Sequence, residues 1–200
     1  MKKHLLTAAA VAAIAVTPLS ASAATFVVDA LTHSADSGAG AGLSTGLSFN
    51  TGDAITISSS LNDLWSAGAL PRWSDANGLV ANTFATGTDE SGAAVGTQIG
   101  QDFGLLTING FSAAYGSLVG RFADGTYQLF GANFAGAAAG TGTLNLFYWD
   151  TFSGDNSGSI SFDVAGSAVP EASTWGMMIV GLGAAGALLR RRRNTKVSFA

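Results

Sequence analysis

The stretch of sequence that decides the fold runs from Thr143 to Val164 and reads TLNLFYWDTFSGDNSGSISFDV. Apolar residues alternate with other residues in both of its arms, which is the period-two pattern of a half-buried β-strand. The residues that share one face are Leu144, Leu146 and Tyr148 in the first arm and Ile160, Phe162 and Val164 in the second. Between the arms, the run from Gly154 to Gly158 is rich in residues that favour turns. The stretch predicts two strands joined by a tight loop.

Further short apolar runs lie upstream of this stretch, and turn-forming residues separate them. We expect strands at 25–30, 46–49, 54–58, 104–108, 117–122 and 127–130, besides 143–149 and 159–164. No segment between the two ends of the chain has a sustained period of 3.6 residues, so helices are not expected there. This organisation predicts an all-β fold, an antiparallel β-sandwich.

Three segments of the same region are expected to lie outside the strands. Asn133–Gly142 is rich in Gly and Ala, offers little to bury and is predicted to be a flexible loop. Ser34–Gly46 is interpreted as a mobile loop, and Leu61–Gly68 as one helical turn or a loop.

The N-terminus has the features of a secretory signal peptide. Lys2 and Lys3 form a positive start, Leu5–Val16 is an apolar run of about twelve residues, and Ala21-Ser-Ala23 fits the small-x-small cleavage rule. We therefore expect residues 1–23 to be removed during export through the Sec translocon.

The C-terminus combines a short motif, an apolar helix and a cluster of arginines. Val169-Pro-Glu-Ala-Ser-Thr-Trp175 is followed by an apolar run that ends at Leu189. A helix from Trp175 to Leu189 covers roughly 22 Å, against about 30 Å of membrane hydrocarbon. Arginine stems can reach the inner interface, and the arginines should stay on the cytoplasmic side. We predict a single C-terminal transmembrane sorting helix that anchors the precursor in the inner membrane, with the preceding domain outside.

This end resembles the PEP-CTERM sorting domain, although Ala172 stands where the family has a second proline. The residues that carry the resemblance are Pro170, Glu171, Trp175, Arg190, Arg191, Arg192 and Arg193. The resemblance implies that an exosortase, a membrane cysteine transpeptidase, cleaves the chain near Pro170-Glu171 and that the product reaches the cell surface or the medium. An ordinary tail anchor is the alternative.

The expected organisation therefore has four parts. These are a signal peptide at 1–23, an extracellular β-sandwich domain at 24–168, a sorting signal at 169–193 and a cytoplasmic tail at 194–200.

The expected extracellular domain is strongly acidic. It contains twelve acidic residues and two basic ones, Arg72 and Arg121, which gives a net charge of −10. Such a domain should repel nucleic acid and anionic lipid, and it could attract divalent cations. The chain has no cysteine, which excludes disulfides and thiolate chemistry. His33 is the only histidine of the domain and is expected in a surface loop, so we do not expect an enzyme.

The richest candidate site is the loop between the last two predicted strands. Asp150, Asp155 and Asn156 supply side-chain oxygens there, and calcium prefers such ligands. A calcium ion with open positions can accept two vicinal hydroxyls of a sugar, with Trp149 or Trp73 as a stacking surface. The other interpretation is that Asp, Asn, Ser and Gly serve only to form the turn.

Several segments of the domain resemble the calcium-dependent galactophilic bacterial lectins of the PA-I type. The resembling segments are 50–57, 71–73, 116–122, 144–150 and 155–162, within a region from about Thr25 to Val164. The resemblance implies a small jelly-roll-like β-sandwich.

The same resemblance implies a set of metal ligands. Asp150, Asp155 and Asn156 would bind calcium through their side chains, and a backbone carbonyl near Ser153 would join them. Another carbonyl is expected from the loop Trp65–Ala67. The family's sugar-contacting histidine and glutamine have no clear match among residues 74–78.

Three functions are compatible with these features. The first is an exported binding module for calcium and carbohydrate, associated with the cell surface or with an exopolysaccharide or biofilm matrix. The second is a structural matrix or surface protein with the same fold and no specific sugar ligand. The third is a glycosidase, which needs two carboxyl groups placed across a cleft, and no motif marks such a pair.

Overall fold

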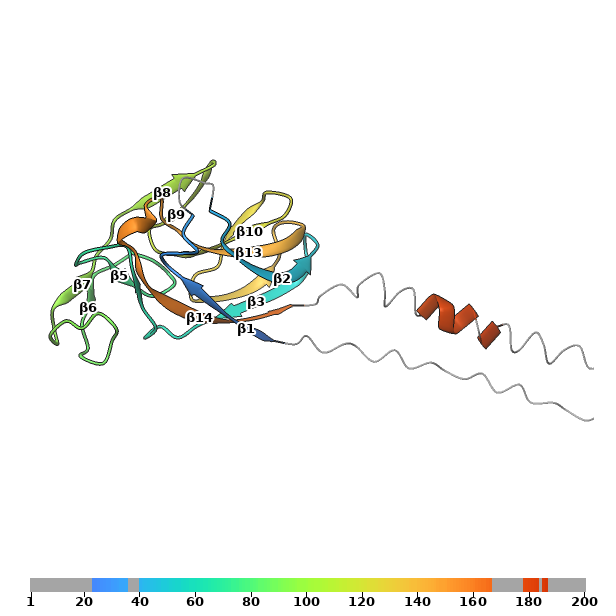
Figure 1. Cartoon of the computed structure of the whole chain (residues 1–200), viewed down its shortest axis with the longest axis horizontal. Coiled ribbons are helices and arrows are strands. Elements are labelled where there is room, and N and C mark those ends of the chain that lie inside the picture. The colour runs from blue at the N-terminus through green and yellow to red at the C-terminus, as the bar shows by residue number, and fades with distance from the viewer. Residues whose placement is uncertain (1–22, 36–39, 167–177, 184, 187–200) are drawn as a thin grey trace, which may run out of the picture.

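The computed structural model of the chain describes residues 23–35, 40–166, 178–183 and 185–186 (Figure 1). All strands of the described residues lie between Ala24 and Gly166, and residues 178–183 and 185–186 are helical. The search of these residues for a helix long and apolar enough to cross a membrane found none. The predicted span from Trp175 to Leu189 lies partly outside the described residues. Residues 1–22, which include nearly all of the predicted signal peptide, lie wholly outside them.

The first sheet is built around the long strand β14 (Ser157–Gly166), because the alternation of its residues buries one face and exposes the other. The other members of this sheet are β1 (Ala24–Asp29), β3 (Ala54–Ser58), β4 (Trp65–Ser66), β5 (Trp73–Ser74) and β12 (Asn133–Ala137). β1, β3 and β4 pair directly with β14, and all three pairings are antiparallel. β12 extends the sheet beyond β3, and β5 extends it beyond β4.

The second sheet has β13 (Gly142–Tyr148) between its neighbours β10 and β2 and is antiparallel throughout. Its order is β11 (Tyr127–Leu129), β10 (Leu118–Phe122), β13 and β2 (Leu43–Phe49). Two hairpins complete the domain, β6 (Thr83–Phe84) with β7 (Gln98–Gly100) and β8 (Leu105–Ile108) with β9 (Phe111–Ala114).

The core lies where the inner faces of the two sheets meet, so the expected antiparallel β-sandwich is confirmed. Both arms of the stretch that begins at Thr143 turn their alternating apolar residues into this core. β13 is also buried on its other face, where Phe147 joins a second cluster with Val119 and Trp149. The hairpin β8–β9 covers this cluster with Leu106 and Ile108.

All eight predicted strands are present, most with bounds that differ by a few residues. The segment Ala54–Ser58 is β3 without change. β2 begins at Leu43, so the end of the predicted mobile loop Ser34–Gly46 is a strand, and residues 36–39 lie outside the described part. Hydrogen bonding to β13 accounts for the longer β2.

The prediction of a flexible loop at Asn133–Gly142 was wrong. β12 pairs antiparallel with β3 over five residue pairs, from Asn133 opposite Ser58 to Ala137 opposite Ala54. The strand lies at the edge of the sheet, where main-chain hydrogen bonds suffice and little side-chain burial is needed. Its one large apolar side chain, Phe134, packs against Phe130 with ring centroids 5.1 Å apart.

The prediction of a helical turn or loop at Leu61–Gly68 was also wrong in its centre. Trp65 is fully buried, packs against Tyr148 at 4.7 Å between ring centroids, and donates from Nε1 to the Gly116 carbonyl at 2.8 Å. This anchor brings Trp65 and Ser66 beside β14, where they form β4.

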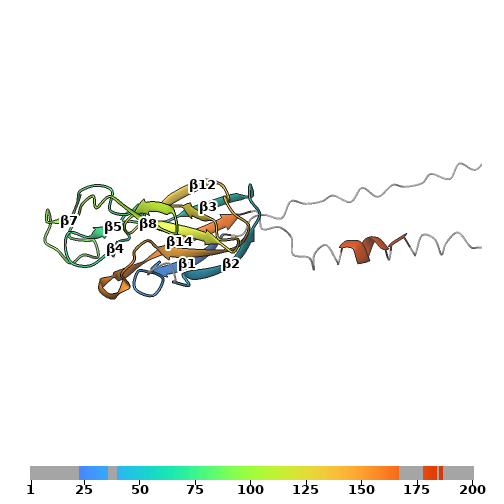
Figure 2. The ribbon, with the colours of Figure 1, turned by 90° about the horizontal axis from the view of Figure 1, so that it is seen from above.

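The described domain is elongated, and its chain ends lie together at one end of it (Figure 2). Ala24 pairs with Val164 there. β14 has ten residues, so its start lies about 30 Å from its end at Gly166. The loop that contains the predicted site is therefore at the opposite end of the sandwich from the point where the chain continues toward the sorting signal.

Candidate functional site

The loop between β13 and β14 is anchored on both sides by buried contacts. Trp149 is fully buried, and its Nε1 donates to the Leu106 carbonyl at 3.0 Å. The carbonyl of Asp150 accepts a hydrogen bond from Ser34 Oγ at 2.9 Å. A short 3₁₀ turn, η2 (Ser153–Asp155), follows, and the Asn156 N–H donates to the Ser153 carbonyl at 3.1 Å. These contacts tie the start of the loop to the hairpin β8–β9 and to the segment that follows β1.

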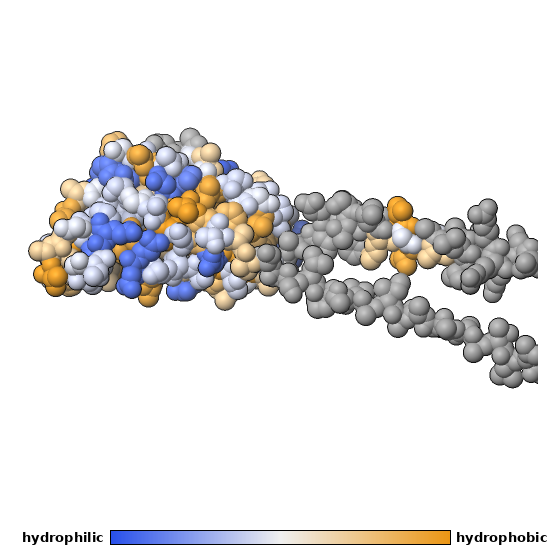
Figure 3. All heavy atoms as spheres, turned by 60° about the horizontal axis from the view of Figure 1, so that its bottom comes forward, coloured by the Kyte–Doolittle hydropathy of each residue, from blue (hydrophilic) through white to orange (hydrophobic). Residues whose placement is uncertain are grey.

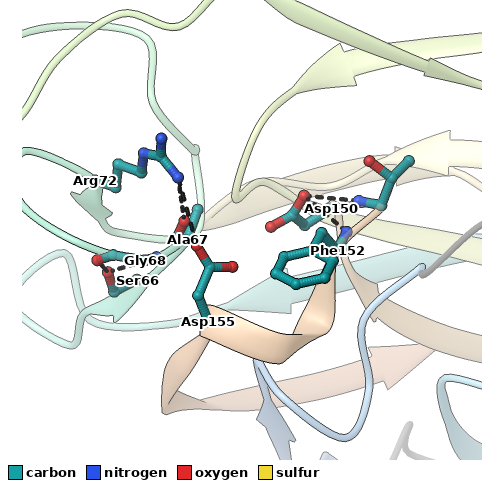
Figure 4. Close-up of polar contacts among 8 residues, drawn as sticks. Ser66, Ala67, Gly68, Arg72, Asp150, Phe152 and Asp155 are labelled. Carbon is teal, nitrogen blue, oxygen red and sulfur yellow. Dashed lines mark hydrogen bonds and ion pairs between the residues drawn. The ribbon is translucent and has the colours of Figure 1, made fainter.

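Beside this loop lies a pocket with a volume of about 270 Å³. It is lined by Ala67, Arg72, Leu79, Phe103, Tyr115, Asp150, Thr151, Phe152 and Asp155. The carboxylates of Asp150 and Asp155 extend toward one another from the two arms of the loop, and Arg72 approaches from the segment between β4 and β5 (Figure 4). Two of the predicted calcium ligands are therefore brought together at one pocket.

Asp150 carries a carboxylate in a largely buried position, with 6% of the residue exposed. Its Oδ1 accepts hydrogen bonds from the N–H groups of Thr151 at 2.7 Å and Phe152 at 3.3 Å. Burial raises the pKa of the Asp150 carboxyl above its usual value, and the nearby charge of Asp155 adds to this rise. The hydrogen bonds from Phe152, Thr151 and the Asn156 side chain act in the opposite direction without cancelling it. An added cation would favour the ionised form of such a carboxyl.

Asn156 is equally buried, and its side chain is only partly satisfied. Its Nδ2 donates to the Ala30 carbonyl at 3.2 Å, while Oδ1 has no hydrogen-bond partner. A buried acceptor without a partner costs roughly 1–3 kcal/mol, so nearly all such groups in native proteins are satisfied. The side chain of Asn156 also hydrogen-bonds to the Asp150 carboxyl, so the unsatisfied oxygen belongs to a direct neighbour of this buried acid, although Asn156 itself does not line the pocket.

Asp155 is half-exposed and pairs with Arg72. Arg72 Nη1 lies 3.5 Å from Asp155 Oδ2, and the two side chains are 43% and 42% exposed. The same Nη1 donates to the Ala67 carbonyl at 3.3 Å. Gly68 has φ +118°, and a side chain there would meet the Asp155 carboxylate, so glycine permits this close approach. An exposed ion pair of this kind stabilises the protein by at most about 1 kcal/mol, so the Asp155 carboxylate can exchange Arg72 for another partner.

These residues fit the ligand chemistry of calcium, although they form no cluster of acids. Within the described residues, no group of three or more His, Cys, Asp or Glu side chains could hold a metal ion. Calcium does not require one, because amide and backbone carbonyl oxygens complete its shell. Asp150, Asp155 and Asn156 Oδ1 provide side-chain oxygens, and the carbonyls of Ser153 and Ala67, which accept hydrogen bonds from the Asn156 N–H and from Arg72 Nη1, are oxygens of the type that calcium binds.

The aromatic residues at the pocket are not those expected. Trp149 is fully buried, so its predicted role as a stacking surface was wrong. Trp73 packs against a small cluster that contains Leu64 and Ile99. Three rings line the pocket, those of Tyr115, of Phe152, which is 65% exposed, and of Phe103, which is 39% exposed.

Two features of the pocket escaped sequence reasoning. Phe152 lies two residues after Asp150 in the loop, and an apolar residue within a polar turn was the available signal. Arg72 had a weaker signal, since it is one of only two basic residues of the acidic domain. Its approach to Asp155 depends on the path of a distant segment.

His33 lies in the turn after β1, where its Nδ1 accepts a hydrogen bond from the Asp29 N–H at 2.9 Å.

Comparison with known proteins identifies the C-terminal segment. Residues 168–193 match the model of the PEP-CTERM protein-sorting motif. The chain carries a PEP-CTERM sorting signal. The expectation of an exported, exosortase-sorted chain is thereby confirmed. The individual sorting residues from Pro170 to Arg193 lie outside the described residues, and the domain limits stay predictions.

Comparison with solved structures gives a structural likeness over most of the chain. A search of the curated proteins found no match. Among solved structures, the chain is similar to one described as "EclA N-terminal domain; PllA-like lectin", with 20% sequence identity and a TM-score of 0.43. The likeness covers 71% of this chain and 94% of that chain.

Proposed function

We propose that this exported chain binds calcium at the Asp150–Asn156 loop and, through calcium, carbohydrate of the cell surface or of an exopolysaccharide or biofilm matrix. The observation that carries the proposal is the buried Oδ1 of Asn156, which has no partner and lies on a residue that contacts the buried carboxylate of Asp150. An oxygen-ligated cation would satisfy both groups at once. No enzymatic activity is proposed for the chain.

In this proposal each residue of the loop has a defined task. Asp150 and Asp155 supply charge, Asn156 supplies its amide oxygen, and the backbone carbonyl of Ser153 joins them. When bound, calcium offers open positions that can exchange water for two vicinal sugar hydroxyls. Phe152 and Phe103 give the pocket apolar walls on which the C–H face of a sugar ring can pack.

The ends of the chain supply the rest of the proposed route. The Sec translocon exports the precursor, the C-terminal helix anchors it in the inner membrane, and exosortase then cleaves it near Pro170-Glu171. The pocket lies at the far end of the sandwich from Gly166, so a sugar can reach it whether or not the C-terminal end is anchored.

Binding to a panel of neutral and acidic glycans, with millimolar calcium and with chelator, tests this function. We expect retention of at least one glycan that chelator abolishes and that Asp155→Ala also abolishes. Asp163→Ala is the matched control, because Asp163 is exposed on β14 and does not line the pocket. Retention that chelator leaves unchanged would contradict the mechanism.

A structural matrix protein without a sugar ligand is the second candidate. The observation in its favour is the Arg72–Asp155 pair, because it already compensates one of the two carboxylates of the pocket. Failure of the whole glycan panel, with normal folding and a normal response to calcium, would favour this candidate.

A further inference from the structure

The pocket contains one charged group that calcium binding does not use, the guanidinium of Arg72. Two contacts fix its position at the wall of the pocket. Nη1 donates to the Ala67 carbonyl at 3.3 Å, and Cζ lies 5.4 Å from the centre of the Phe103 ring. The side chain is 43% exposed, so a ligand can reach it from solvent. A positive charge is therefore held at the pocket of an otherwise acidic domain.

The net charge of the pocket changes sign when a divalent cation binds. The charged side chains that line it are Arg72, Asp150 and Asp155, which sum to −1. Calcium brings this sum to +1. Asp155 then binds the calcium ion and no longer pairs only with Arg72. Remote acidic residues contribute little, because physiological salt screens charges over about 8 Å. The loaded pocket is thus complementary to a ligand with one negative charge.

We propose that the calcium-loaded pocket selects saccharides that carry a carboxylate, as uronic acids do, and that Arg72 pairs with this carboxylate. The inference rests on the proposed calcium function and specifies its ligand class. The planar guanidinium can bind both oxygens of a carboxylate, which a hydroxyl group cannot match. A neutral sugar would satisfy calcium through its hydroxyls and leave the positive charge of the pocket without a partner.

The charge arrangement also explains why the selection depends on calcium. In the metal-free protein Asp155 Oδ2 lies 3.5 Å from Arg72 Nη1 and competes with any incoming carboxylate. The pair is exposed and weak, so calcium can draw Asp155 away from Arg72. Arg72 retains its contacts with Ala67 and Phe103, which keep the guanidinium at the wall.

Calorimetric titration of the whole chain, purified in detergent with excess calcium, tests the inference. The probes are matched methyl glycosides, which are galactose with galacturonate, glucose with glucuronate and mannose with mannuronate. At least one uronate should bind about tenfold or more tightly than its neutral partner, as expected for a charge-assisted pair. Arg72→Gln should lose this preference, and Arg72→Lys should keep part of it.

Arg121→Gln is the control, because it removes the same charge from the other arginine of the domain. Arg121 does not line the pocket, and its Cζ lies 5.6 Å from the centre of the Tyr127 ring. This variant should keep the full preference for the uronate. A preference that survives in Arg72→Gln would mean that the carboxylate binds through calcium, and it would overturn the role of Arg72. Equal affinity for all matched pairs would overturn the selectivity itself.

A melting curve of each variant with and without calcium separates this inference from the function on which it rests. If calcium raises the melting temperature but no uronate is preferred, only the ligand class is wrong. If calcium leaves the wild-type melting temperature unchanged, the calcium function fails, and the inference fails with it.

Discussion

The buried carboxyl of Asp150 should make both folding stability and calcium affinity depend on pH. Its pKa is raised in the folded protein, so the native state holds the proton at pH values where the unfolded chain has lost it. Stability of the metal-free protein should therefore fall as pH rises from the usual pKa of an aspartate through the raised one. Calcium requires the ionised form, so protons should compete with it in the same window.

The variant Asp150→Asn should separate these two effects. It keeps an oxygen for the N–H groups of Thr151 and Phe152 and removes the charge. We expect a higher melting temperature than wild type at neutral pH without metal, and no rise on addition of calcium. Melting curves of both proteins across a pH series measure these differences. A calcium affinity of the wild type that does not depend on pH would contradict the role of the Asp150 carboxyl.

Arg72 should weaken calcium binding, because its Nη1 contacts both the Asp155 carboxylate and the Ala67 carbonyl. Arg72→Gln removes this competition at a half-exposed site. We expect a calcium Kd about two- to fivefold lower than wild type, since exposed charge interactions are worth up to about 1 kcal/mol. Calcium titrations of Arg72→Gln and of the control Arg121→Gln measure this change in Kd. An unchanged or weaker affinity in Arg72→Gln would contradict competition between Arg72 and calcium for the same oxygens.

At the scale of elements, two phenylalanines that lie close in sequence, one in the loop after β13 and one in β14, should differ sharply in their contribution to stability. Phe162 lies in β14 and is fully buried in the core, whereas Phe152 is 65% exposed in the loop. Phe162→Ala should lower the free energy of unfolding by about 3–5 kcal/mol, and Phe152→Ala by less than about 0.5 kcal/mol. Chemical denaturation measures both, and similar losses in the two variants would contradict the proposed packing.

The strands that sequence could predict are those whose side chains alternate. β13 and β14 show this pattern clearly, and both form the centre of the sandwich. β12 could not be predicted, because a strand of Gly and Ala at a sheet edge depends on main-chain hydrogen bonds to β3. β4 depends on one buried side chain, Trp65. It is only two residues long, which is too short to show the alternation by which a strand is recognised.

The candidate site was predictable where its residues are neighbours in sequence. Asp150, Asp155 and Asn156 belong to one loop, and turn chemistry with oxygen ligands marked them. Arg72 and Phe103 reach the pocket from segments far along the chain, and no local pattern indicates such a meeting. The burial of Trp149 was missed because its outer face is covered by the hairpin β8–β9.

At the scale of the whole molecule, the sorting signal and the proposed binding loop are separate segments of the chain and should fail independently. On the face drawn in Figure 3, hydrophobic residues of the domain lie in small groups among hydrophilic ones. Because residues 168–193 match the sorting motif, this segment should determine how the chain is processed.

Glu171→Gln should block processing and leave the domain intact. Glu171 belongs to the matched motif, and loss of a charge from a recognised motif typically costs a partner about tenfold or more in affinity. We expect the precursor to accumulate in the membrane fraction with an unchanged calcium response. Glu90→Gln, which alters the only other glutamate, should be processed normally. Normal processing of Glu171→Gln would show that the motif does not direct sorting here.

Thermal unfolding of the whole chain in detergent, with millimolar calcium and with chelator, tests the central claim most directly. A ligand at about a hundredfold excess over its Kd stabilises the folded state by roughly 2.7 kcal/mol, which corresponds to a rise of about 5–11 °C. We expect this rise in wild type and in Asp163→Ala, and its loss in Asp155→Ala. Identical melting temperatures of wild type with calcium and with chelator would contradict a calcium site at the Asp150–Asn156 loop.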